Sequence, residues 1–276
     1  MLSLAVSPLW AGDVFRDLLS NQPAVRQGAL AHIYEMDSAA KKKLIEKINS
    51  SLEKKEPVNH VYLFEALGRL GPEAIPVLAQ GLTDPDYKAR SLTAEELGKK
   101  GPQASSVVSY LIPLLKDPSF PVRINTIRSL GKIAIPPGQI ETALLPLLND
   151  GDEGIRSETI DALGALGPSA EKSPPALEKL LKKDTWRIQW KAAKALGDIG
   201  PAAKSAVTAL IQSLYSEKDI VQNQSRLALV KIGPPAVPAL KKELKTKHDR
   251  VREDVRKTLK EIGTPEAFEA LESAAK

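Results

Sequence analysis

The chain has 276 residues, of which 42% are hydrophobic and only 4% aromatic, and its formal net charge is +5. Such a chain can bury a large core of Leu, Ile, Val and Ala, and its mild basic excess does not by itself indicate a nucleic-acid partner. The sequence contains no cysteine, which excludes disulfides, thiolate metal ligands and cysteine nucleophiles.

Residues 1–11 form a short apolar segment whose role is open. Ala11, Gly12 and Asp13 look like the residues around a signal-peptide cleavage point, but no Lys or Arg precedes the apolar run. The segment is therefore either a cap over the first helices or the remnant of an export signal. The localisation therefore stays open: the protein is cytoplasmic if the segment is a cap, and exported to the periplasm if it is a signal remnant. No run in the sequence approaches the roughly 20 apolar residues of a membrane span.

Residues 12–276 are predicted to form one domain with divergent ends. Residues 12–56 are expected to be N-terminal capping units that include a long polar helix over 38–54. Regular repeats follow over 57–263. Residues 264–276 are expected to form a C-terminal capping helix, with Phe268 and Leu271 packed back onto the array.

The regular part repeats the phrase Leu-Gly-x-apolar-Gly-Pro at a nearly fixed interval. Its fifth position recurs after 30 or 33 residues, and this period predicts a solenoid of stacked supersecondary units. Clear copies begin at Leu67, Leu97, Leu163 and Leu196, and degenerate copies begin at Leu130, Leu229 and Leu259.

Each repeat reads as two helices, as residues 134–167 illustrate. Pro137 suits the first turn of a first helix, and Pro146 should kink or split that helix. A second helix with apolar or small residues on one face should then end at Gly167, in a left-handed cap. The Gly-Pro dipeptide thus acts as a stop-and-restart signal between repeats.

The second helices share the pattern apolar-Arg-x-x-small-x-x-x-Leu-Gly-x-apolar-Gly-Pro, which resembles the HEAT repeat. The similarity is to the short bacterial form that also occurs in phycobilisome lyase subunits, and it covers roughly residues 57–276. The resemblance implies an all-α fold, an α-solenoid of stacked antiparallel helix pairs with the second helices lining the concave side. The family contains many unrelated activities, so the resemblance alone does not assign a function.

An Asp lies six residues before an Arg in three consecutive repeats. In proteins that this chain resembles, such residues form a ladder along the turns, in which each Asp accepts hydrogen bonds from a nearby Arg. The resemblance therefore implies a structural role here, and Arg123 should hydrogen-bond the carboxylate of Asp117 or of the neighbouring Asp84 or Asp150. The pairs are Asp84 and Arg90, Asp117 and Arg123, and Asp150 and Arg156.

The sequence offers no catalytic residues, no metal site and no cofactor motif. Its three histidines, His32, His60 and His248, lie in distant repeats without metal-ligand spacing, and are interpreted as surface or helix-end residues. They also lack the His-Glu dipeptides of the di-iron HEAT-repeat hydroxylase. Serine-nucleophile, phosphate-loop and dinucleotide motifs are absent as well. The chain is therefore predicted not to be an enzyme.

Two tryptophans one helical turn apart are the most unusual side chains. Trp190 takes the position that Ser91, Ile124, Ser157, Asn223 and Glu253 hold in sister repeats, which predicts exposure on the concave face. Trp186 is expected to be largely buried at the seam between repeats. Exposed Trp beside Arg and Lys is typical of a binding hot spot. The candidate partner-binding residues are Trp190, Arg187, Lys191, Lys194, Arg128 and Lys132.

These observations favour a non-catalytic protein-interaction scaffold with a protein partner of unknown identity. A phycobilin-lyase-like subunit or a chaperone acting on another protein is an alternative suggested by the repeat type. Nucleic-acid binding is a weaker alternative, because positive and negative residues balance on the predicted concave face. The same balance argues against similarity in function to the HEAT-like DNA glycosylases. The oligomeric state stays open.

Overall fold

The computed structural model describes residues 11–56 and 58–274, and every regular element in these ranges is helical. The predicted apolar segment at 1–11 lies outside the described residues, apart from Ala11, which begins helix α1. Among the described helices, none is both long enough and apolar enough to cross a membrane. The expectation of an all-α fold is confirmed.

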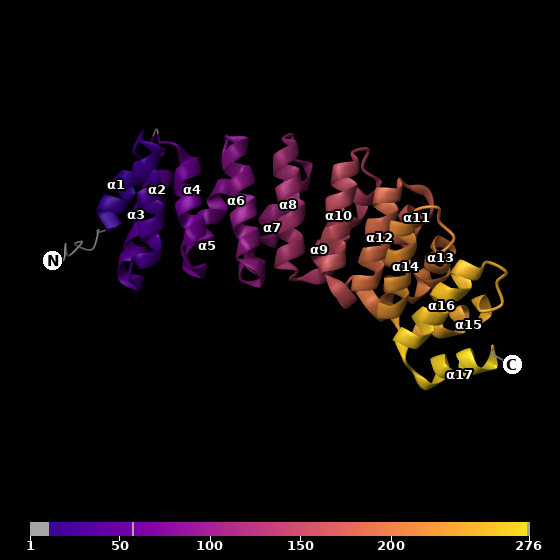
Figure 1. Cartoon of the computed structure of the whole chain (residues 1–276). Helices are drawn as coiled ribbons and strands as arrows, with labels where there is room; N and C mark the ends of the chain where they lie inside the picture. Colours follow the sequence, from indigo (N-terminus) through magenta and orange to yellow (C-terminus); the bar gives the residue numbers. More distant parts are fainter. Residues whose placement is uncertain (1–10, 57, 275–276) are drawn as a thin grey trace. The chain divides into compact units, whose positions relative to one another are not determined.

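The chain divides into two compact units, residues 1–129 and 130–276, and the boundary falls inside helix α8. In the first unit, indigo to magenta in Figure 1, pairs of antiparallel helices are stacked in chain order. Helices α1, α2 and α3 lie within residues 12–56 apart from Ala11, the range that was expected to form divergent capping units. Its elements are α1 Ala11–Leu18, α2 Pro23–His32, η1 Ile33–Glu35, α3 Ser38–Glu53, α4 His60–Arg69, η2 Pro72–Ala74, α5 Ile75–Leu78, η3 Ala79–Thr83, α6 Tyr87–Lys99, η4 Gly101–Val107, α7 Val108–Leu111, η5 Ile112–Lys116 and α8 Phe120–Ile133, where η denotes a 3-10 helix.

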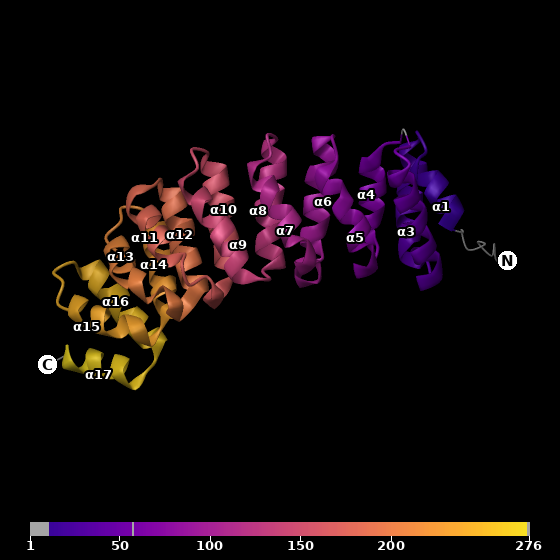
Figure 2. The ribbon, with the colours of Figure 1, turned by 180° about the vertical axis from the view of Figure 1, so that it is seen from behind.

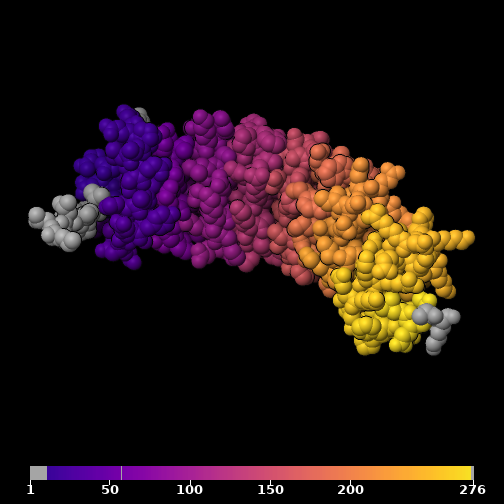
Figure 3. Space-filling model, in the orientation of Figure 1, coloured from indigo at the N-terminus to yellow at the C-terminus, as the bar shows by residue number. Residues whose placement is uncertain are grey.

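The second unit repeats the same arrangement, and views from opposite sides show α10, α12 and α14 following one another (Figure 1 and Figure 2). Within each unit, side chains fill the spaces that the ribbons leave between neighbouring helices (Figure 3). The elements of the second unit are α9 Pro137–Leu144, η6 Leu145–Asn149, α10 Glu153–Ala165, η7 Gly167–Ser169, α11 Pro174–Lys183, α12 Trp186–Ile199, η8 Gly200–Ala206, α13 Val207–Ser213, α14 Asp219–Ile232, η9 Pro234–Ala236, α15 Val237–Glu243, α16 Asp249–Ile262 and α17 Pro265–Ser273.

Proline and glycine shape each repeat as the sequence predicts. Pro137 opens α9, and Pro146 splits the first helix, so that α9 ends at Leu144 and a 3-10 helix continues. Gly167 follows α10 with a φ of +57°, the left-handed value expected of a helix-ending glycine. Ala134 holds the same position after α8 with a φ of +56°, although it has a Cβ. Gly71 departs from the pattern, because its φ of −70° is not left-handed.

The core is a column of leucines supplied by the second helices. The Leu of each repeated phrase is fully buried, as are the small residues four positions before it. Short side chains at those positions let neighbouring second helices approach closely. The hydroxyls of Thr126 and Thr159 donate hydrogen bonds to the backbone carbonyls one turn earlier, at 2.8 and 2.7 Å. The buried leucines are Leu67, Leu97, Leu130, Leu163, Leu196, Leu229 and Leu259.

A last helix, α17, is present where a C-terminal capping helix was expected, but its packing face differs from the prediction. Ala267 and Ala270 of α17 are buried, whereas Phe268 is 48% exposed. Helix α17 packs on α15 and α16. The small alanines permit a close approach to these helices, and the following residue, Phe268, is then turned outward.

Candidate functional site

The second helices of the repeats form one surface of each unit, here called the second-helix face. In the first unit this face comprises α4 and α6, and in the second unit it comprises α10, α12, α14 and α16. Helix α8 carries the unit boundary. All the predicted partner-binding residues lie on α8 or α12.

The predicted ladder of Asp and Arg runs along the turns and holds consecutive repeats together. Arg90 donates to the backbone carbonyls of Asp84 and Pro85 in its own turn, at 2.8 and 3.0 Å. Its other nitrogens donate to both carboxylate oxygens of Asp117 in the next turn, at 2.7 and 3.0 Å. The link to the next repeat is therefore a bidentate ion pair.

Arg156 repeats this geometry with Asp150 and Asp184. It donates to the Asp150 carbonyl at 2.9 Å and to the two carboxylate oxygens of Asp184 at 2.9 and 3.0 Å. Arg123 donates to the carbonyls of Asp117 and Pro118, at 2.8 and 3.2 Å. Arg90 and Arg156 thus bond the backbone of the Asp six residues earlier and the carboxylate of the following turn. Arg123 bonds turn carbonyls where a carboxylate was predicted.

The ladder perturbs the ionisation of its members. Burial opposes the ionised form of Asp117, but the hydrogen bonds from Arg90 and from the Ser119 N–H outweigh it, so the pKa of this carboxyl lies below its usual value. The hydrogen bond to Asp117 raises the pKa of Arg90. At the start of the array, His60 takes the place of the arginine, with Nδ1 2.6 Å from Oδ2 of Asp84. The histidines lie at helix ends, as predicted.

The two tryptophans are placed in the reverse of the expected order. Trp186, predicted to be buried, is 39% exposed, and Trp190, predicted to be exposed, is half-buried. Trp186 is the first residue of α12, where Tyr87 and Phe120 begin α6 and α8 and are also exposed. The guanidinium of Arg187 lies 4.8 Å from the Trp186 ring centroid.

The repeat position of Trp190 does not have one fixed exposure along the array. Ser91 and Ile124 are buried at this position and Ser157 is half-buried, whereas Asn223 and Glu253 are exposed. In the first unit, the amide of Asn125 on α8 donates to the Ser91 hydroxyl of α6 at 3.0 Å, so the position there lies against the neighbouring second helix. Exposure at this position therefore differs from repeat to repeat and could not be read from the type of the sister residues.

The candidate basic residues of α12 are paired with carboxylates. Lys191 pairs with Asp161 of α10. Lys194 and Lys231 both bond Asp198, each at 2.7 Å. Burial opposes the ionised form of Asp198, but these two ammonium groups outweigh it and hold its pKa below the usual value. The predicted positive cluster on α12 is therefore largely neutralised within the unit.

The other two candidates lie on α8. Arg128 belongs to the first unit, and Lys132 belongs to the second unit and is exposed. Arg187, Trp190, Lys191 and Lys194 share α12.

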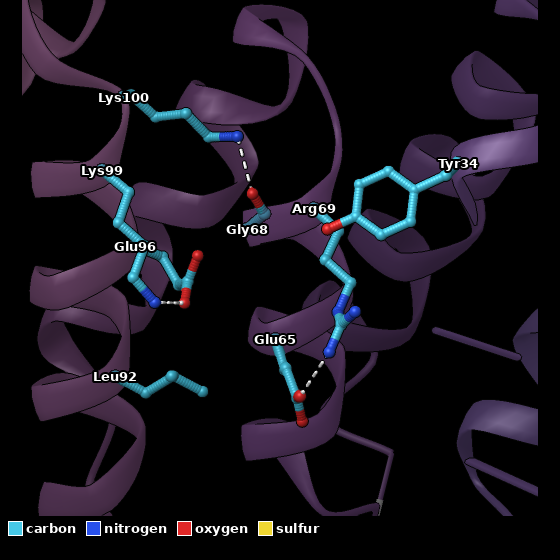
Figure 4. A pocket seen from close by; sticks show the side chains of 8 residues that line it. All are labelled: Tyr34, Glu65, Gly68, Arg69, Leu92, Glu96, Lys99 and Lys100. Atoms are coloured by element: carbon cyan, nitrogen blue, oxygen red, sulfur yellow. Dashed lines mark hydrogen bonds and ion pairs between the residues drawn. The ribbon is translucent and has the colours of Figure 1, made fainter. Parts of the chain in front are cut away.

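A pocket of about 570 Å³ opens on the second-helix face of the first unit, between η1, α4 and α6 (Figure 4). In Figure 4, side chains from these three segments surround its centre. Arg69 donates to Glu65 at 3.2 Å, and its guanidinium lies 5.9 Å from the centroid of the exposed Tyr34 ring. The pocket is lined by Tyr34, Glu65, Gly68, Arg69, Leu92, Glu96, Lys99 and Lys100.

Two charged groups of α6 reach into the seam between α4 and α6. Glu96 is 8% exposed, lies against Gly68, and accepts a hydrogen bond from Lys99 at 2.7 Å. Lys100 donates to the carbonyl of Gly68 at 2.6 Å and to that of Leu70. Burial lowers the pKa of Lys100, although Glu96 and Glu73 partly offset this effect. Burial also disfavours the charge of Lys99, but its bonds to Glu96 and Glu95 raise its pKa.

Sequence reasoning did not identify this pocket, although the repeats contained a signal for it. Lys100 lies inside one copy of the repeated phrase, at the position where every other copy has Leu or Ile. Comparing each position across the repeats would have marked Lys100 and Glu96 as exceptions. Tyr34 could not have been found this way, because it lies in the divergent N-terminal part.

Within the part of the chain that the structure describes, no three His, Asp or Glu side chains are grouped as metal ligands. The second-helix face carries ion pairs, exposed aromatic rings and a polar pocket.

Comparisons with solved structures identify other helical-repeat proteins. An engineered protein matches 96% of this chain and 82% of its own, with a TM-score of 0.59 and 22% identity. The designed armadillo repeat protein YIII(Dq.V1)4CPAF, solved in complex with peptide (KR)4, matches 68% of this chain and 99% of its own, with a TM-score of 0.53 and 18% identity. The complex of CpcE and CpcF of phycocyanin lyase from Nostoc sp. PCC7120 matches 100% of this chain and 97% of its own, with a TM-score of 0.45 and 19% identity.

These identities are low enough that the similarity concerns the fold alone. No curated protein matches the sequence significantly. The family model for HEAT repeats matches residues 75–142, 108–190 and 140–230, which together span more than half of the chain. With the stacked helix pairs and the buried leucine column, this match shows that the chain belongs to the HEAT-repeat family.

Proposed function

We propose that the chain is a non-catalytic scaffold that binds a protein partner on its second-helix face, which we expect to be the concave side of the solenoid. The proposed contacts in the second unit are Arg187, Trp190, Lys191 and Lys194 of α12. Arg128 and Lys132 of α8 are further candidates.

The observation that carries this proposal is the pairing of charges across second helices. Lys191 with Asp161, Lys231 with Asp198, and Arg226 with Glu261 at 2.6 Å each join neighbouring repeats. A nucleic-acid surface needs unpaired cations to neutralise phosphates, whereas this face presents alternating charges. Protein interfaces combine an apolar, aromatic centre with a polar rim, so paired charges around exposed apolar groups are compatible with one.

Exposed apolar side chains supply the second component of such an interface. Trp186 is 39% exposed at the start of α12, and Leu227 is 41% exposed on α14. Burial of these groups by a partner would be favourable, and the surrounding ion pairs would select its charge pattern. That a designed armadillo repeat protein of similar fold was solved with a bound peptide supports the capacity of such a scaffold for peptides.

Photo-crosslinking tests the proposal directly. Benzoylphenylalanine would replace Arg187 or Lys194 on α12, and in control proteins it would replace Tyr110 of α7 or Lys241 of α15, which lie on first helices. Each purified variant would be irradiated in lysate of the source organism, and the adducts would be identified by mass spectrometry.

We expect one protein to be captured from the α12 positions and not from the first-helix positions. Capture only from α7 or α15, or nucleic-acid adducts from α12, would contradict the proposal. A captured protein that carries a visible-light chromophore would favour the lyase-type alternative, which the absorbance of the complex would reveal.

A further inference from the structure

The pocket between α4 and α6 contains two charged residues that break the rules of the repeat. Glu96 occupies a position that is small in every sister repeat, and Lys100, four residues later, occupies one that is apolar in every sister repeat. Residues at i and i+4 lie on the same face of a helix. The equivalents of Glu96 are Ala66, Ser129, Ala162, Ala195, Ala228 and Thr258, and those of Lys100 are Leu70, Ile133, Leu166, Ile199, Ile232 and Ile262.

The sister residues show what these positions normally do. Ile133, Ile199 and Ile232 are fully buried and contribute to the core. Ala162, Ala195 and Ala228 lie against the glycine of the preceding second helix, where a larger side chain would not fit without displacement. In the first unit, Glu96 instead extends across Gly68. A repeat built on the common pattern would therefore be more apolar and more closely packed at this seam.

Both exceptions place a charge where sister repeats have an apolar or small side chain. Lys100 is half-buried and so loses part of its hydration, and its hydrogen bonds to the carbonyls of Gly68 and Leu70, at the end of α4, offset part of that cost. Local departures from the rules that specify a fold are expected at functional sites. That both departures line the same pocket indicates that the pocket is the reason for them.

The charges in the pocket favour an anionic ligand. Glu65 is bonded by Arg69 and Glu96 by Lys99, so both lining carboxylates already have a cationic partner. Three cations and two carboxylates line the pocket, and Lys100 is the lining cation that bonds carbonyls in place of a carboxylate. Outside the lining, Glu95 also pairs with Lys99 at 2.9 Å, and Glu73 acts on the charge of Lys100 from a distance. The phenol of Tyr34 adds a further potential donor, and this side chain is 64% exposed.

An aliphatic contact accompanies these donors. Leu92 lines the pocket and is half-buried, at a repeat position that holds Tyr62 in the preceding repeat and a polar residue in the later ones. The corresponding residues are Asn125, Glu158, Lys191, Gln224 and Asp254. A ligand that places an apolar group on Leu92 and an anion beside Lys100 would contact both the unusual aliphatic residue and the unusual cation of this repeat.

We propose that this pocket binds a peptide segment of the partner in which a carboxylate side chain, lying beside an aliphatic residue, pairs with Lys100, Lys99 and Arg69. The inference rests on the proposed function and names the chemistry of one contact. The pocket volume of about 570 Å³ is sufficient for two or three side chains. The net charge of +5 also favours an acidic partner. The lowered pKa of Lys100 is consistent with an acidic ligand, because a bound carboxylate would stabilise the protonated ammonium and raise that pKa.

The test uses a library of random heptapeptides selected on the immobilised full-length chain. The most enriched peptide is labelled, and its binding is measured by fluorescence anisotropy beside a version in which Gln or Asn replaces each acidic residue. The protein variants are Lys100→Ile, which restores the residue of four sister repeats, Lys99→Gln, and Lys88→Gln as the control. Lys88 is exposed on the same helix and does not line the pocket.

We expect acidic peptides to be enriched, and both the amide peptide and the Lys100→Ile variant to weaken binding by about tenfold or more, the effect of losing a buried charge partner. Lys99→Gln should weaken binding, and Lys88→Gln should leave it unchanged. The melting temperature of Lys100→Ile should equal or exceed that of the unmodified chain, because an isoleucine suits this seam.

Three results would overturn the inference. One is enrichment of basic or neutral peptides, and another is binding that Lys100→Ile and Lys99→Gln leave unchanged. The third is a lower melting temperature for Lys100→Ile with unchanged binding, which would make Lys100 a structural cap of α4. Enriched peptides whose binding depends on Trp190 and Lys191 but not on the pocket would contradict this inference and leave the proposed function standing. If no peptide is enriched on any surface, both the inference and the proposed function fail.

Discussion

At the scale of single residues, the repeated sequence acts as its own reference. Arg90 and Arg156 each bond their own turn and the Asp of the next one, so their identity is explained by the scaffold. Lys100 and Glu96 differ from these arginines, because sister repeats close without charged residues at their positions, although Lys100 bonds the last carbonyls of α4. Residues that the repeat requires and residues that it merely tolerates can therefore be distinguished.

The Arg90 to Asp117 pair should make stability sensitive to acid. Because the folded-state pKa of Asp117 lies below its unfolded value, its contribution is complete above the unfolded pKa of about 4 and is lost as the pH falls through the folded value. Urea unfolding at pH 5 and pH 3 should show a smaller loss for Asp117→Asn than for the unmodified chain. Glu272→Gln, on the exposed end of α17, serves as the control. Equal losses in Asp117→Asn and the unmodified chain would show that the pair does not contribute.

The two tryptophans should respond differently to truncation. Trp186→Ala removes an exposed ring and should change the free energy of unfolding by less than about 0.5 kcal/mol. Trp190→Ala removes a half-buried ring from the seam and should cost about 1–3 kcal/mol, below the value for a fully buried aromatic residue. Thermal and urea denaturation measure both changes. A larger cost for Trp186→Ala would mean that its exposure has been misjudged.

At the scale of the helix and its turn, the sequence predicts most of the structure. Pro137, Pro146 and Gly167 determine where helices start, split and end, because their backbone restrictions act locally. The orientation of single side chains was less predictable. Trp190 and Phe268 were assigned to the wrong environment because exposure depends on how closely the neighbouring helix approaches. The pocket escaped sequence reasoning because η1 and α4 contribute to it together with α6.

The left-handed residue at the end of each second helix offers a matched pair of substitutions. Ala134 has a φ of +56°, where a Cβ is unfavourable, so Ala134→Gly should stabilise the protein by about 0.5–1 kcal/mol. Gly167 has a φ of +57° and open space around an added Cβ, so Gly167→Ala should cost about 1–2 kcal/mol through backbone strain alone. Urea unfolding would measure both, and the same sign for both substitutions would contradict this explanation.

The buried leucine column should transmit damage only to its neighbours. Leu163 is fully buried in the second unit, and Leu163→Ala should cost about 2–5 kcal/mol through lost burial and a cavity. Since coupling in a solenoid is between adjacent repeats, hydrogen exchange should accelerate most in α10 and α12. Equal acceleration at α1, α10 and α17 would show that the array unfolds as one unit.

At the scale of the whole molecule, each unit is a stack of HEAT repeats whose second helices present a mixed surface. Paired charges, exposed rings and one polar pocket occur on this surface, and these features suit a protein partner better than a phosphate backbone. The fold follows from the repeat, whereas under the proposed function the few positions where the repeat is broken would select the partner.

Hydrogen exchange of the full-length chain, with and without the partner captured from α12, tests this central claim most directly. The account predicts that the partner slows exchange in peptides from the second helices, α6 and α12 above all, while first-helix segments such as α7 and α15 are unaffected. Protection confined to α7, α9, α13 and α15, with no change in α6 or α12, would contradict it.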